Sequence, residues 1–82
     1  MGPQWTRHAL DRACQRFGFL ARRKRGALVA RLRRSLLAGV VIEARPGGIS
    51  VVRSTIGRRR YPIEFVVEDR TGRVVTVQRP GW

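Results

Sequence analysis

The feature that most constrains the fold is a change in hydrophobic spacing at Gly39. Before this residue, apolar side chains recur every three or four positions, which is the spacing of one face of an α-helix. After it, apolar and polar residues alternate and β-branched residues are frequent, as in half-buried β-strands. The sequence therefore predicts an α+β fold in which helices come first and strands follow.

Two helices are predicted in the first half of the chain. One spans residues 6–17, with Thr6 as its N-cap and Gly18 as its terminator. The other spans residues 26–38 and is closed by Gly39. The side chains expected to enter the core are Ala9, Leu10, Ala13, Cys14 and Phe17 in the first helix, and Leu28, Val29, Leu32, Ser35 and Leu36 in the second.

Four strands are predicted in the second half, over residues 40–44, 49–56, 61–68 and 73–78. The segments between them are about four residues long, and such short connections join antiparallel neighbours. We therefore predict a single domain, residues 1–82, in which two N-terminal helices pack on one face of a four-stranded antiparallel meander sheet.

The charge of the chain indicates what it binds. The 82 residues include 18 Lys and Arg but only 5 Asp and Glu, a net charge of +13, and all but one of the cations are arginine. The positive charges repel each other and destabilise the compact state of so small a domain, and a polyanionic partner explains why the chain carries them. Guanidinium groups also bind phosphate in a bidentate manner and stack on bases. We expect nucleic acid, and RNA in particular, with an acidic protein surface and an anionic membrane as the alternatives.

Other classes of protein are disfavoured by the residues that the chain lacks. Cys14 is the only cysteine, so it forms no internal disulfide, and with a single histidine the chain cannot build a zinc site. No phosphate-binding glycine loop or Ser-His-Asp set is present. No apolar run approaches the about 18 residues that span a bilayer, and no signal peptide is recognisable. We expect a cytoplasmic protein without a metal, a cofactor or a membrane anchor.

Three clusters of cations are the predicted nucleic-acid contacts. The first lies between the two helices, the second on the outer side of the second helix, and the third in the turn after the second strand. No core requires charged side chains at such places, so they are available to phosphate. The clusters are Arg22, Arg23, Lys24 and Arg25, then Arg31, Arg33 and Arg34, of which Arg31 and Arg34 are the predicted contacts, and finally Arg58, Arg59 and Arg60.

Two motifs resemble small RNA-cleaving toxins of the RelE/ParE type and related phage and prophage families. The segment Thr6-Arg7-His8-Ala9-Leu10-Asp11-Arg12, with Arg16 one turn later, is similar to the His-Ala-x-x-Arg helix that opens several such families. The segment Gly72-Arg73-Val74-Val75-Thr76-Val77 is similar to their last strand. The resemblance implies a RelE-like fold, metal-independent cleavage of RNA, and a toxin that is held inactive by an acidic antitoxin.

Cleavage without a metal requires a base, an acid and cations that stabilise the charged phosphorane. Histidine is the side chain that ordinarily titrates near neutrality, and His8 is the only one in the chain. Arg12 and Arg16 follow it at one and two helical turns. Tyr61 or Glu64 would supply the second proton-transfer group. Tyr61, which is also a candidate stacking ring, and Thr76, as a phosphate or ribose contact, complete the predicted catalytic set. Each residue also has a plainer interpretation, as a surface or strand-forming side chain.

A second hypothesis belongs to a different class of function. The chain is then a non-catalytic phage or mobile-element protein that docks on a host nucleic-acid machine and inhibits it. RNA polymerase, the ribosome and a nuclease are the machines considered, and the basic surface competes with their nucleic acid. The composition is compatible with both hypotheses, so the identity of the partner and the cleavage of any bond stay open.

Overall fold

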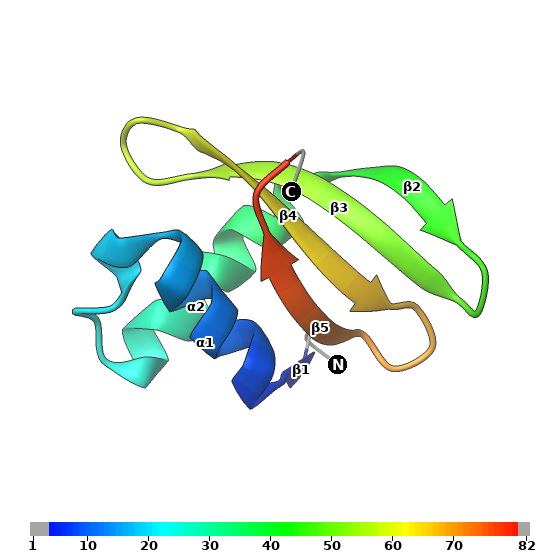
Figure 1. Ribbon diagram of the computed structural model, residues 1–82, viewed down its shortest axis with the longest axis horizontal. Coiled ribbons are helices and arrows are strands. Elements are labelled where there is room, and N and C mark those ends of the chain that lie inside the picture. The colour runs from blue at the N-terminus through cyan, green and yellow to red at the C-terminus, as the bar shows by residue number, and fades with distance from the viewer. Residues whose placement is uncertain (1–3, 81–82) are drawn as a thin grey trace.

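Both helices of the structure lie on one face of a twisted sheet (Figure 1). The structure is a computed structural model that describes residues 4–80. Its helices are α1 (Arg7–Arg16) and α2 (Arg25–Leu37), joined through the 3₁₀ turn η1 (Gly18–Leu20). Its strands are β1 (Gln4–Trp5), β2 (Val40–Arg45), β3 (Ile49–Ile56), β4 (Tyr61–Glu68) and β5 (Arg73–Gln78). The predicted α+β class with two N-terminal helices is confirmed.

The sheet differs from the prediction at one edge. Over residues 4–80 it has five strands in the order β1-β5-β4-β3-β2, and it is mixed rather than antiparallel throughout. Strands β2 to β5 form the predicted antiparallel meander. The added strand β1 runs parallel to β5, with Gln4 opposite Arg73 and Trp5 opposite Val74. The prediction of four antiparallel strands was wrong because two residues are too few to show any alternation.

The start of α1 is fixed by Thr6, as predicted. The Thr6 hydroxyl accepts a hydrogen bond from the Ala9 amide at 3.0 Å, so it satisfies one of the open N–H groups of the first turn. The same hydroxyl donates to the Val74 carbonyl of β5 at 3.0 Å. One side chain therefore both caps the start of α1 and joins this helix to β5, the strand that pairs with β1.

The end of α1 is built differently from the prediction. Gly18 is not in the left-handed conformation expected of a terminating glycine, and the chain instead continues into η1. The Arg79 guanidinium donates to the Arg16 carbonyl, through Nε at 3.1 Å, and lies 5.5 Å from the centroid of the Phe17 ring. A cation at this position satisfies an open carbonyl and complements the helix dipole. Arg79 thus joins the end of the last strand to the end of the first helix.

Helix α2 buries the stripe that its periodicity predicts. Its Ser35 hydroxyl donates to the Thr55 carbonyl of β3 at 2.7 Å, which ties the polar member of the stripe to the sheet. This bond satisfies a hydroxyl that would otherwise be costly to bury. The buried residues of the stripe are Leu28, Leu32 and Ser35, and Val29 and Leu36 pack partly buried beside them.

Gly39 matters for its small size rather than for helix termination. It is not in a left-handed conformation. A Cβ atom on Gly39 would lie only 2.6 Å from Cγ1 of Val52 and 3.0 Å from the carbonyl oxygen of Arg53. The chain therefore crosses from α2 to β2 so close to β3 that a larger residue would force β3 to move.

The core fills the space between the helices and the sheet. Phe65 is its largest fully buried side chain, and the Trp5 ring meets it edge to face with 5.9 Å between centroids. Such aromatic pairs stabilise beyond the area that they bury. The buried members of the core are Ala9, Leu10, Ala13, Phe17, Leu20, Leu28, Leu32, Val52, Ile56, Ile63, Phe65, Val74 and Val77.

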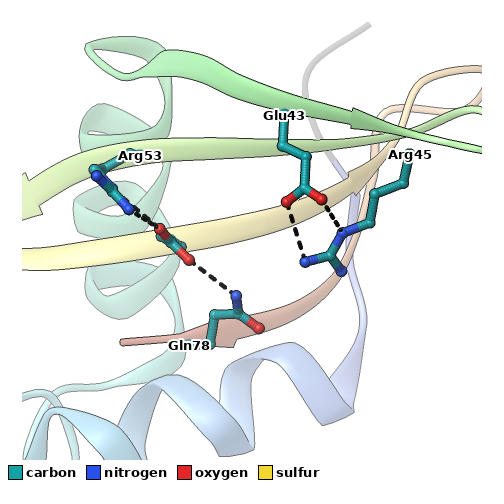
Figure 2. Close-up of polar contacts among 5 residues, drawn as sticks. Glu43, Arg45, Arg53 and Gln78 are labelled. Carbon is teal, nitrogen blue, oxygen red and sulfur yellow. Dashed lines mark hydrogen bonds and ion pairs between the residues drawn. The ribbon is translucent and has the colours of Figure 1, made fainter. Parts of the chain in front are cut away.

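The sheet face opposite the helices holds a nearly buried carboxylate, Glu64. It accepts hydrogen bonds from Arg53, at 2.7 and 3.0 Å, and from Gln78 at 2.9 Å, so three strands are joined through one side chain (Figure 2). Burial alone raises the pKa of the Glu64 carboxyl, but the bonds from Gln78 and Arg53 and the charges of Arg53 and Arg45 outweigh it. The pKa of Glu64 therefore lies below its ordinary value, and an ionised Glu64 is part of the sheet's own structure.

Candidate nucleic-acid interface

Four of the five acidic residues lie on the sheet or its turns, and the fifth, Asp11, lies on α1. The β2–β3 and β4–β5 turns lie together at one end of the sheet, where the Asp69 amide donates to the Gly48 carbonyl at 2.8 Å. The β3–β4 turn lies at the other end (Figure 1). The polar partners of the sheet and turn carboxylates are Arg45 for Glu43, Arg53 for Glu64, Thr71 for Glu68 and Ser50 for Asp69.

A groove runs between α2 and the β3–β4 turn. One part of it has a volume of about 360 Å³ and a second part about 410 Å³, and both parts are lined by Arg31, Gly57 and Arg58. In Figure 1 the turn projects on the same side of the molecule as η1. No carboxylate from residues 4–80 lines either part. We call this feature the hairpin groove, and its arginines are Arg23, Arg31, Arg34, Arg58 and Arg59.

The guanidinium groups of the five hairpin-groove arginines have no partners among residues 4–80. Within the described part of the chain, none of their guanidinium groups forms an ion pair or a hydrogen bond, and the two ion pairs found there belong to Arg45 and Arg53. Unpaired cations around one groove repel each other, so an anion that enters the groove is attracted by all of them. Their N–H groups match the geometry of phosphate oxygens.

One end of the hairpin groove is formed by two exposed aromatic rings. Phe19 of η1 is 40% exposed and Tyr61 of β4 is 41% exposed, and their ring centroids lie 5.8 Å apart with the planes inclined at 34°. Gly57 supports this aromatic pair: it adopts a φ of +82°, and a Cβ atom there would lie 3.0 Å from the Phe19 ring. Glycine is thus required at the turn both for its left-handed backbone and for the position of the ring.

The predicted nucleic-acid-binding residues divide into two groups. Arg23, Arg31, Arg34, Arg58 and Arg59 converge on the hairpin groove from three separate stretches of sequence. The others are exposed nearby but do not line it, and these are Arg22, Lys24, Arg25 and Arg60.

Arg60 stands out by its backbone. Its φ of 51° is a left-handed conformation, which costs an ordinary residue about 1–2 kcal/mol relative to glycine. The Arg60 amide donates to the Gly57 carbonyl at 3.1 Å and closes the turn. The third arginine of the turn is therefore placed where glycine would be more stable.

The predicted catalytic residues are not gathered at one place. His8 is exposed in the first turn of α1, and Arg12 lies on the same helix with a hydrogen bond to Gln15 at 3.4 Å. Tyr61 lies instead beside Phe17, which directly follows Arg16, the last residue of α1. Phe17, the C-cap of α1, lies nine positions after His8, which corresponds to a rise of about 13 Å along a helix.

Thr76 lies on the other side of the sheet from these residues. It pairs with Val66 of β4. Val66 lies on the same face of the sheet as Glu64, opposite the helices, and does not belong to the core that faces the helices. Arg16, another predicted catalytic residue, lies at the end of α1, where its carbonyl accepts a hydrogen bond from the Arg79 guanidinium. His8, Tyr61 and Thr76 therefore occupy three different regions of the molecule.

Between residues 4 and 80, no group of three His, Cys, Asp or Glu side chains could hold a metal ion. No helix in this range is long and apolar enough to cross a membrane. Burial, and then the negative charge of Asp11, raise the pKa of the Cys14 thiol, which disfavours the reactive thiolate.

The sequence did not identify Phe19 as part of the site. In the sequence, Phe19 and Leu20 are adjacent apolar residues between the two predicted helices. In the structure Leu20 is buried, whereas Phe19 is exposed. An available signal was the position of Phe19, three residues before the run of cations that begins at Arg22, since exposed aromatic residues beside cations are typical of nucleic-acid surfaces.

Comparison of the chain with family models, with curated proteins and with solved structures finds no match.

Proposed function

We propose that the protein binds nucleic acid, and RNA in particular, in the hairpin groove. The observation that carries the proposal is the convergence of five unpaired arginines on a groove without a carboxylate among its described lining residues. A phosphate backbone would neutralise charges that otherwise repel each other. The resemblance of the first helix and last strand to RelE-type toxins supports RNA over DNA.

Binding is the function that the geometry supports best, and cleavage is a further hypothesis. Acid–base catalysis needs its groups within hydrogen-bond reach of one reacting phosphate. His8 and Tyr61 lie near opposite ends of α1, so they do not meet that condition together in this conformation. An RNA interferase that uses His8 would need its second group from elsewhere.

The test is to mix the purified protein with labelled RNA and DNA of one sequence and to measure both retention and fragments. Five phosphate contacts predict a loss of affinity of roughly 100- to 500-fold between about 50 and 200 mM salt. We expect RNA to be retained uncleaved, and His8→Ala to bind it as the wild type does, because His8 lies outside the groove.

Two results would change this account. If RNA fragments appear and His8→Ala slows their release by about 10²–10⁴-fold, the protein is a ribonuclease that uses His8. If neither RNA nor DNA is retained even at about 50 mM salt, the proposed function is wrong.

The exposed edge of the sheet favours the second candidate, an inhibitor that docks on a host nucleic-acid machine. In β2, Val40, Val41 and Ile42 are 67%, 59% and 45% exposed, and β2 has no neighbour on its outer side within residues 4–80. Such an edge can accept another strand. An acidic extended segment of a host protein fits it better than a second copy, since two copies would each bring a charge of +13. This candidate predicts that the protein alone retains neither RNA nor DNA.

A further inference from the structure

We infer that the hairpin groove selects single-stranded over double-stranded RNA, because one unpaired base stacks on the aromatic pair Phe19 and Tyr61 while the neighbouring phosphates contact the arginines. This inference rests on the proposed function and adds the class of substrate to it. The juxtaposition that carries it is an exposed pair of rings at the end of a groove whose charged side chains have no partners in the described part of the chain.

The rings are exposed although an apolar surface of this size is ordinarily buried. Phe19 and Tyr61 leave about two fifths of their surface open, whereas Phe17 and Phe65 are 3% and 0% exposed. The structure fixes the pair in place, since the Phe19 ring lies close to Gly57 and pairs with the Tyr61 ring. A ring held in position loses little side-chain freedom when a ligand covers it.

The geometry of the pair determines where a base can lie. Rings at van der Waals contact are about 3.5 Å apart, so a base between two others needs roughly 7 Å. The centroids of Phe19 and Tyr61 are only 5.8 Å apart, so a base stacks on the outer surface of the pair. That surface adjoins Arg23, Arg31 and Arg59, which line the same depression.

A duplex cannot use this surface. Its bases are stacked on each other inside the helix, and only phosphates and groove edges are available. The arginines alone would therefore accept single and double strands alike, whereas the rings add affinity only for a base that is already unstacked. The aromatic pair thus provides selectivity, and the arginines provide most of the affinity.

The experiment compares a single-stranded RNA with a duplex of the same sequence at one salt concentration, using wild type, Tyr61→Leu and Tyr61→Phe. The wild type should prefer the single strand. Tyr61→Leu should weaken binding of the single strand about 5- to 150-fold, the range for one stacked base, and leave binding of the duplex unchanged. Tyr61→Phe keeps the ring and should bind both as the wild type does.

Ile42→Ala is the matched control, because it removes an exposed apolar side chain of β2 that lies outside the groove. It should change neither affinity. If wild type binds the duplex as tightly as the single strand, or if Tyr61→Leu weakens both equally, the selectivity for single strands is wrong while RNA binding stands. If wild type binds neither RNA, the proposed function itself fails.

Discussion

Replacing Leu32 with alanine is expected to lower the free energy of unfolding by about 2–5 kcal/mol. Leu32 is fully buried in the middle of α2, in the cluster that joins the helices to the sheet. The substitution removes buried methyl groups and leaves a cavity that the surrounding side chains fill only partly. A domain of this size has a total stability of only about 4–12 kcal/mol, so the loss is a large fraction of it. Urea denaturation followed by circular dichroism measures the change.

Leu37→Ala is the matched control for this prediction. Leu37 lies on the same helix, five residues further, and is 68% exposed. Its truncation is expected to change the free energy of unfolding by no more than about 0.5 kcal/mol. Equal effects of the two substitutions would show that the assigned buried face of α2 is wrong.

Neutralising three arginines of the hairpin groove is expected to weaken RNA binding roughly 10²–10³-fold. The variant replaces Arg31, Arg34 and Arg58 with glutamine, and each lost phosphate contact lowers the affinity about 5- to 8-fold at 0.1 M salt relative to 1 M salt. The slope of log affinity against log salt should also fall by about 2–3. The fold should be retained because none of the three has a partner among the described residues. Fluorescence anisotropy with labelled RNA over a range of salt concentrations measures both quantities.

The control variant removes the same amount of charge elsewhere. Arg7, Arg70 and Arg73 are exposed, and none of them lines the hairpin groove. Replacing these three with glutamine should weaken RNA binding only a few-fold, about as much as a general loss of charge does. If both triple variants lose the same affinity, total charge governs binding and the hairpin groove is not the site.

Local pattern was sufficient to predict most of the secondary structure. The spacing of Leu28, Leu32 and Ser35 identified the buried side of α2, and Thr6 identified the start of α1, because these features depend on residues within a turn or two. Strand β1 could not be predicted in this way. Its two residues are a strand only because β5, about 70 positions later, provides the hydrogen-bonding edge.

The arginine clusters were predicted, but their assembly into one groove was not. Arg31 and Arg58 are 27 positions apart, and no spacing rule indicates that α2 packs beside the β3–β4 turn. The same limit applies to the predicted catalytic set. A helical period correctly places His8 and Arg12 near each other, but the position of Tyr61 relative to His8 depends on how the sheet meets the far end of α1.

Nuclear magnetic resonance of the ¹⁵N-labelled protein, titrated with a single-stranded RNA of about eight nucleotides, shows directly whether RNA binds in the hairpin groove. We expect the largest chemical-shift changes in residues 19–23, 31–35 and 57–61, which contain the hairpin groove and its aromatic pair. Residues 40–45 of the exposed edge and residues 69–73 of the far turns should shift little. Largest shifts around His8 or along β2, or no shifts at all, would contradict binding in the hairpin groove.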